Sequence, residues 1–179
     1  MNRIEEGIAL ANQMGFEGVG ELKREALIFR AEVRQMCSAD RCHAYGKNWC
    51  CPPGCGTIEE AAQRVEGYSR GVIVQTVGQL EDEFDFESMQ ETARIHQERF
   101  AKLVAQLKTK WPEVFPMGAG TCTICKECTY PEAPCRFPDR AIPSMEAYGL
   151  WVSDVCEKSG IPYSYGKNTI AYTSCFLLP

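Results

Sequence analysis

The 179-residue sequence predicts one α/β domain over residues 1–179, with a mostly parallel or mixed sheet flanked by helices. Two observations predict this class. Stretches with helical periodicity alternate along the chain with short apolar, β-branched runs. Two cysteine-rich loops, 37–56 and 120–140, come where predicted strands end. Open α/β sheets build their sites at strand ends, so these loops are where we expect the chemistry.

Local patterns in the first half of the chain predict three elements. Apolar residues at helical spacing predict a helix over residues 3–14, and an apolar run over 26–33 predicts a strand that leads to Cys37. Thr57 is followed three residues later by Glu60, the spacing of a capping box, so a helix should begin there.

The second half continues the alternation. A short β-branched run over 71–77 predicts a buried strand. A long helix should follow the acidic stretch after it and run to about Lys110, with acids at its start and lysines at its end, as the helix dipole favours. Further patterns predict a strand over 114–117, a helix beginning at 143–147 and a last strand over 169–178.

Composition excludes several classes of protein. The chain has 19 Lys and Arg against 24 Asp and Glu, whereas a sequence-independent nucleic-acid binder needs a basic surface. No apolar run approaches the roughly 20 residues that span a bilayer, and no secretory segment is evident. We therefore expect a cytoplasmic protein with no nucleic-acid or membrane partner. In that reducing compartment, the 11 cysteines indicate metal binding rather than disulfides.

The second cysteine window has the spacing of an iron–sulfur ligand run. Three thiols at two-residue intervals can turn around one compact core, and ferredoxin-type runs open in this way. Four-cysteine zinc sites usually use two separated C-x2–4-C pairs, which a consecutive triple fits less well. The window therefore favours a 4Fe–4S cluster over zinc, with the ligands Cys122, Cys125, Cys128 and Cys135.

The first window holds five thiols within 19 residues: Cys37, Cys42, Cys50, Cys51 and Cys55. Adjacent side chains tend to point apart, so one of Cys50 and Cys51 should bind while the other packs or faces solvent. We favour Cys37, Cys42, Cys51 and Cys55 as the ligands of a metal centre. If only three thiolates bind, a four-iron cluster keeps one open iron, which can act as a Lewis acid. If Cys55 closes the site, the centre is an electron relay or a structural clip.

Other residues receive structural interpretations. We expect His43 to be a turn residue or hydrogen-bond donor rather than a ligand, and Tyr45 and Trp49 to cover the first site. Cys156 and Cys175 should pack inertly in a helix and a strand. His96 should be an exposed polar residue of the long helix.

Two motifs carry a family resemblance. The first is Val33-Arg34-Gln35-Met36-Cys37, then Cys42 with Tyr45-Gly46-Lys47, then Cys51-Pro52-Pro53. The second is Gly120-x-Cys122-x2-Cys125-x2-Cys128 with Pro134-Cys135-Arg136-x-Pro138, followed by Pro143-Ser144-Met145-Glu146-Ala147-x-Gly149. They resemble the motifs of a family of small bacterial and archaeal "predicted metal-binding" proteins of unknown function, over roughly residues 26–178. The resemblance implies metal or iron–sulfur binding and an anaerobic setting. It also implies that Cys37, Cys42 and Cys51 belong to the first motif, with Cys50 and Cys55 as additions.

Together these observations predict an iron–sulfur protein with one or two 4Fe–4S clusters that passes single electrons to a redox partner protein. One alternative is an enzyme whose cluster has an open iron for a small-molecule substrate, and another is a zinc-stabilised interaction module. Assembly into a homo-oligomer is compatible with each of the three. The sequence has no P-loop and no G-x-G-x-x-G after a strand that would support other chemistry.

Overall fold

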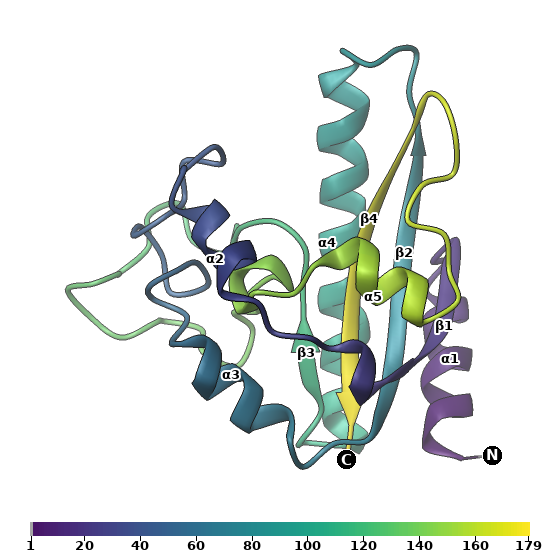
Figure 1. The fold of residues 1–179 in the computed structure, drawn as a ribbon, viewed down its shortest axis with the longest axis horizontal. Coiled ribbons are helices and arrows are strands. Elements are labelled where there is room, and N and C mark those ends of the chain that lie inside the picture. The colour runs from purple at the N-terminus through teal and green to yellow at the C-terminus, as the bar shows by residue number, and fades with distance from the viewer. Residues whose placement is uncertain (1) are drawn as a thin grey trace.

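A computed structural model describes residues 2–179, so Met1, the first residue of the predicted domain, lies outside it. Within these residues the chain forms five α-helices, two 3-10 turns and four strands (Figure 1). In chain order they are α1 (Arg3–Gln13), β1 (Gly18–Lys23), η1 (Arg24–Ala26), α2 (Ala31–Cys37), α3 (Ile58–Val65), β2 (Arg70–Gln79), α4 (Phe86–Lys110), β3 (Phe115–Met117), η2 (Glu146–Tyr148), α5 (Val152–Lys158) and β4 (Thr169–Leu178).

The four strands form one sheet in the order β1-β2-β4-β3, and every pairing is antiparallel. The α/β class is therefore confirmed, but the predicted parallel or mixed sheet is wrong. The reason lies in the path of the last strand. Helix α4 joins β2 to β3, which run in the same direction, yet β4 returns between them and pairs with both in the opposite direction.

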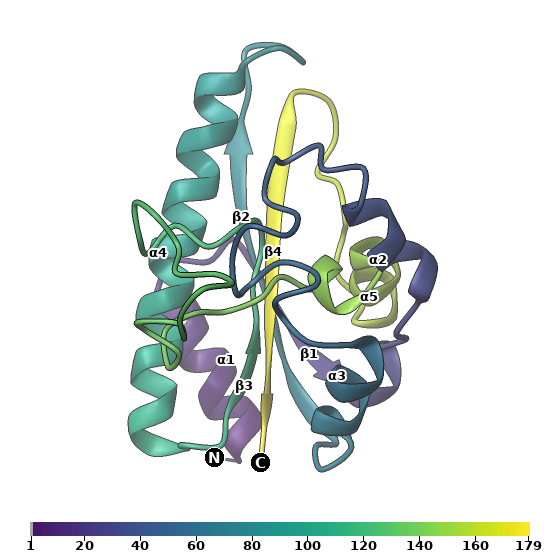
Figure 2. The ribbon, with the colours of Figure 1, turned by 90° about the vertical axis from the view of Figure 1, so that its left-hand side faces the viewer.

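Two hydrophobic layers hold the helices on the sheet. Alternate strand residues point to opposite faces, so Val72, Val74 and Phe176 pack on α1 and α4, which cover one face (Figure 2). On the other face, Ile73 and Cys175 pack against α3, α5 and the 3-10 turns. These side chains are fully buried, which makes β2 and β4 the centre of the fold.

Several predicted elements are confirmed. The strands β2 and β4 and the helices α1 and α4 lie where their patterns indicated. Helix α3 begins with the predicted capping box: the Thr57 hydroxyl accepts from the Glu60 N–H at 3.1 Å, and the Glu60 carboxylate accepts from the Thr57 N–H at 2.7 Å. Within residues 2–179, no helix is both long and apolar enough to cross a membrane.

Two local predictions are wrong, and one strand was missed. The strand predicted over 26–33 does not form: Phe29 makes only an isolated bridge to Leu150. Residues 31–37, most of which are good helix formers, form helix α2 instead. The helix predicted from Pro143 is reduced to the single turn η2, which ends at Gly149 with a φ of 83°. A Cβ at Gly149 would also lie 2.7 Å from the Arg30 carbonyl oxygen, so a glycine is required there. The edge strand β1 was not predicted.

Candidate metal centre

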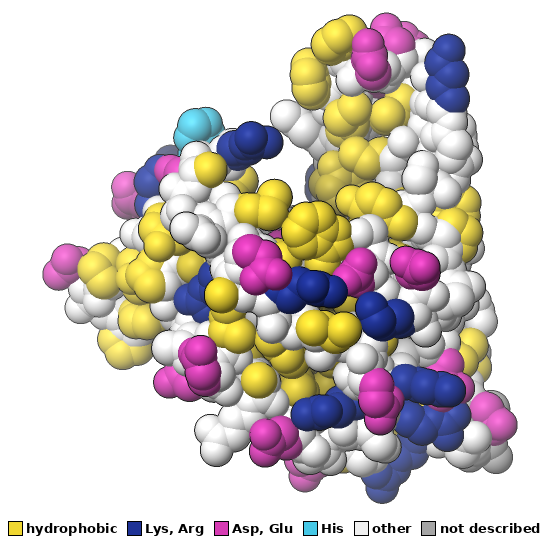
Figure 3. All heavy atoms as spheres, in the orientation of Figure 1, with side chains coloured by type: hydrophobic (Ala, Val, Ile, Leu, Met, Phe, Trp, Pro, Cys, Tyr) yellow, Lys and Arg dark blue, Asp and Glu magenta, His cyan; other side chains and the backbone are white. Residues whose placement is uncertain are grey.

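The two cysteine loops form one lobe at the side of the sheet. The first joins α2 to α3 and the second joins β3 to η2, and the lobe stands out from the helix and sheet body (Figures 1 and 3). The first loop therefore follows a helix, whereas the sequence predicted a strand before it. Side chains coloured as hydrophobic, a class that includes Cys and Pro, lie along the outer end of the lobe (Figure 3).

Polar and aromatic contacts join the two loops. The buried Asn48 amide donates to the Thr121 hydroxyl at 3.3 Å, and the Trp49 indole donates to the Ala133 carbonyl at 3.1 Å. The Trp49 ring also meets the Tyr130 ring edge-on, with the centroids 4.9 Å apart. Because these loops have no regular secondary structure, such contacts must supply their order.

A close backbone approach tightens this junction at Gly54. A Cβ at this position would lie 2.5 Å from the Asn48 carbonyl oxygen and 2.9 Å from the Tyr130 ring. Only glycine leaves room for the first loop to turn against its own backbone and against the second loop at the same point.

The first site is a cavity of about 250 Å³. Three of the four predicted ligands of this site line it: Cys37, Cys42 and Cys51. The Cys51 Sγ lies 3.5 Å from the Thr121 hydroxyl, which belongs to the second loop. Tyr45, expected to cover the site, also lines the cavity. The structure thus brings three thiols from different parts of the first window to one space.

The fourth predicted ligand, Cys55, lies beside this cavity rather than on its wall. Its half-buried Sγ donates to the Ala147 carbonyl at 3.7 Å and lines a neighbouring cavity. Burial raises the pKa of the Cys55 thiol, the Arg34 charge opposes that rise, and Cys51 and Cys37 add to it. The thiol is therefore electrostatically close to the first site without facing its open space.

Arg34 gives the first site a nearby positive charge. Its guanidinium lowers the pKa of both Cys37 and Cys55, although burial raises each of them more. One guanidinium nitrogen, Nη1, is buried and has no hydrogen-bond partner within residues 2–179. A buried donor without a partner is costly, so this nitrogen fits a site that carries negative charge, as thiolates around a metal do.

The second site gathers five thiols rather than four. The predicted ligands Cys122, Cys125, Cys128 and Cys135 line a narrow cavity of about 30 Å³, and Cys50 of the first window lies with them. Sequence reasoning did not assign Cys50 to this site. The available signal was its adjacency to Cys51: the two side chains point apart, Cys51 to the first cavity and Cys50 to the second.

Hydrogen bonds set the protonation of these thiols. A hydrogen bond between Cys50 and Cys122 raises the pKa of Cys50 far above its ordinary value and lowers the pKa of Cys122 to about 6. An N–H donated by Ile124 adds to the lowering at Cys122. The pairing thus favours the deprotonated form at Cys122, the form that binds metal, over that at Cys50. The backbone N–H of Phe137 donates to the Cys135 sulfur at 3.4 Å.

The remaining predictions divide into confirmed and wrong. Cys156 and Cys175 are buried in α5 and β4, as expected for packing residues. His43 is exposed in a turn with a φ of 55°. The predicted exposure of His96 is wrong. That ring is fully buried, because Thr76 and Ser174 hydroxyls bond its Nδ1 and Nε2 at 2.9 and 2.7 Å.

The donor set has the chemistry of a metal or iron–sulfur site. Thiolates are soft ligands that select iron–sulfur clusters, zinc and copper(I), and several cysteines, which can supply such ligands, line each cavity. Within residues 2–179, the side chains of His, Cys, Asp and Glu form no group of three or more that could hold a metal ion directly.

The fold and the two loops define an α/β protein with cysteine-lined cavities in one lobe. The family described as "Predicted metal-binding protein (DUF2284)" matches residues 20–178, nearly the whole chain, and the chain belongs to this family. The resemblance seen in the two cysteine motifs is thereby confirmed. No curated protein matches the chain, and no solved structure does.

Proposed function

We propose that the protein is an iron–sulfur redox protein with two cysteine-ligated centres, which passes single electrons to a redox partner protein in the cytoplasm. One observation carries the proposal for the first centre: Cys37, Cys42 and Cys51 line a cavity of about 250 Å³, more space than a single ion held by thiolates needs. The second centre is proposed from the two-residue spacing of Cys122, Cys125 and Cys128. A four-iron cluster, when bound, supplies one-electron oxidation and reduction.

The residues of the chain have separate roles in this proposal. Cys122, Cys125, Cys128 and Cys135 would hold the second centre, with Cys50 donating a hydrogen bond to the Cys122 thiolate. The guanidinium of Arg34 would offset negative charge at the first centre.

The experiment is anaerobic purification followed by iron, zinc and acid-labile sulfide analysis and a visible spectrum. We expect about eight iron and eight sulfide per chain, the content of two 4Fe–4S clusters. Cys125→Ser should lower the iron to about four per chain, whereas the matched control Cys156→Ser, at a buried thiol on α5 outside both cavities, should leave it unchanged. A colourless protein with stoichiometric zinc and no sulfide would refute the proposal and leave a zinc-stabilised module.

A second candidate, an enzyme with an open iron, is favoured by the position of Cys55. Only three thiols line the first cavity, and the Cys55 sulfur is engaged with the Ala147 carbonyl. The Cys55→Ser variant distinguishes the electron carrier from the enzyme with an open iron. Unchanged iron content and spectrum would leave the first centre with three thiolates, whereas loss of about four iron would make Cys55 its fourth ligand and favour the electron carrier.

A further inference from the structure

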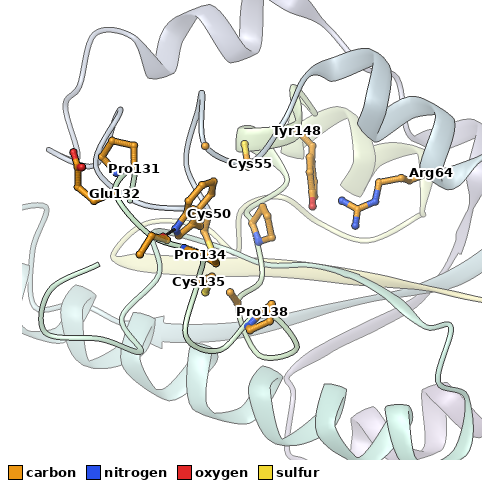
Figure 4. A pocket seen from close by; sticks show the side chains of 14 residues that line it. Cys50, Cys55, Arg64, Pro131, Glu132, Pro134, Cys135, Pro138 and Tyr148 are labelled. Atoms are coloured by element: carbon orange, nitrogen blue, oxygen red, sulfur yellow. Dashed lines mark hydrogen bonds between the residues drawn. The ribbon is translucent and has the colours of Figure 1, made fainter. Parts of the chain in front are cut away.

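A third cavity, of about 600 Å³, adjoins the second thiol site, with which it shares Cys50 and Cys135. Thiols of both windows reach its wall: Cys50 and Cys55 from the first, and Cys135 from the second (Figure 4). Its volume is that of an ordinary small-molecule pocket, and such pockets combine apolar walls with a few placed polar groups. Neither proposed centre needs this space.

Most of the cavity wall is rigid and apolar. Four prolines contribute to it, together with the flat ring of Trp49. Trp49 is fixed by its hydrogen bond to the Ala133 carbonyl and by the Tyr130 ring. A ligand in this cavity would therefore meet a preformed apolar surface, which favours a compact organic body over a bare inorganic ion.

Two polar groups lie together on one side of the cavity, Arg64 from α3 and Tyr148 from η2 (Figure 4). Tyr148 is only 3% exposed, and burial raises the pKa of its hydroxyl to about 12 while the Arg64 charge lowers it. The hydroxyl and the guanidinium are therefore close enough to interact, and both can donate hydrogen bonds to one ligand.

Arg64 supplies charge at the same place. The guanidinium lies over the Phe115 ring, 5.4 Å from its centroid, and forms no ion pair within residues 2–179. The one acidic residue among those lining the cavity, Glu132, is on the opposite side (Figure 4). The cavity thus has an electropositive end and an electronegative rim, which fixes where an anion would go.

We propose that this cavity binds a small organic acid, with the carboxylate held by the Arg64 guanidinium and the Tyr148 hydroxyl and the apolar body against Trp49 and the prolines. Guanidinium and hydroxyl donors suit a carboxylate. Binding of the acid stands independently of the metal; only its use as the substrate of the thiol-ligated centres rests on the proposed function.

Anaerobic calorimetric titration of the purified protein with benzoate tests the proposal. Benzoate is a flat monocarboxylate; benzyl alcohol is its neutral counterpart, and inorganic phosphate is an anion without an apolar body. We expect saturable binding of benzoate at one site. Benzyl alcohol should bind at least roughly tenfold more weakly because it lacks the charged hydrogen bond, and phosphate at least roughly tenfold more weakly because it has no apolar body to bury. Absence of saturable benzoate binding, or preference for phosphate, would overturn the proposal.

Variants locate the site. Arg64→Gln and Tyr148→Phe should each weaken benzoate binding roughly tenfold, and Arg64→Lys should weaken it less than Arg64→Gln does. Two controls should bind as the wild type does or more tightly: Glu132→Gln on the opposite rim, and Arg94→Gln, which removes two exposed ion pairs on α4. Unfolding of each variant in urea verifies folding. Equal affinity in Arg64→Gln and the wild type would refute the assignment.

Iron and sulfide measured in the same samples keep this proposal separate from the proposed function. Saturable benzoate binding by a protein without iron would support the cavity and refute the redox centres. Full iron content without benzoate binding would support the redox centres and refute the acid-binding cavity.

Discussion

Lowering the pH from 7 to 5 should destabilise the protein through His96. This ring is fully buried on α4, held between the Thr76 and Ser174 hydroxyls at 2.9 and 2.7 Å. Burial, with a smaller contribution from the Arg99 charge, lowers the pKa of His96 to about 3. The folded protein therefore keeps the ring neutral at pH values where the unfolded chain takes up a proton.

The difference between the folded and unfolded pKa of His96 sets the sign and size of the stability change. An unfolded histidine has a pKa of about 6.5, so the stabilising contribution of the neutral ring is fully present above that pH. It is lost as the pH falls from about 6.5 toward the folded pKa of about 3. The free energy of unfolding therefore decreases by about 2 kcal/mol when the pH is lowered from 7 to 5. That is a large share of the roughly 5–15 kcal/mol by which domains are stable.

Urea unfolding at pH 7, 6 and 5, under anaerobic conditions, measures this effect in the wild type and in His96→Gln. Glutamine does not titrate but can still bond both hydroxyls. The variant starts less stable, and its free energy of unfolding should fall by about 2 kcal/mol less than that of the wild type between pH 7 and 5. Metal loss at low pH would affect both proteins alike. Equal pH dependence in the two proteins would refute the argument.

Three further substitutions test the cysteine lobe. Gly54→Ala should destabilise the protein by about 1–3 kcal/mol in urea unfolding, because the new Cβ would lie 2.5 Å from the Asn48 carbonyl oxygen. The control Gly67→Ala, with no atom within 4 Å of the new Cβ, should change stability little; an equal loss in both would refute the packing argument. Trp49→Phe should cost about 1 kcal/mol in the same assay, since it removes the hydrogen bond between the loops. If the proposed centres form, Arg34→Gln should make the midpoint potential of the first centre more negative in a redox titration, and an unchanged potential would place Arg34 outside its influence.

Much of the fold could be predicted because the signals were local. The β-branched run of β2, the apolar stripe of α4 and the Thr57–Glu60 capping box each identify one element without reference to the rest of the chain. Strand direction is not local. It depends on where β4 inserts, and alternating helices and strands are equally compatible with parallel neighbours.

Edge strand β1 and the burial of His96 could not be predicted for the same reason. Gly18 and Gly20 weaken the strand pattern of β1, but they are needed there, because a Cβ would lie 2.5 Å from the Gln75 side chain and 2.8 Å from Ile161. Those contacts come from segments distant in sequence. His96 is polar on a polar-rich helix, and only the partners on β2 and β4 make its burial favourable.

At the candidate site, the sequence separated cysteine-rich loops from packing cysteines, but it divided the thiols between the loops by their order along the chain. The structure divides them by direction. The Cys50 side chain lies with the cysteines of the second window, and the Cys55 side chain lines the third cavity. The path of the folded loop sets these directions. Spacing therefore predicts which cysteines gather, whereas loop packing decides around which space they gather.

The step from Cys50 to Cys51 then connects the two proposed centres. Cys50 lines the second cavity and Cys51 lines the first, and their Cα atoms are about 3.8 Å apart. A single peptide unit therefore separates the walls of the two sites. Centres held this close should interact magnetically when both are reduced. The electron paramagnetic resonance spectrum of the reduced wild type should therefore differ from that of Cys125→Ser by more than the loss of one signal. A spectrum equal to the sum of two isolated clusters would show that the loops hold the centres farther apart than this shared peptide implies.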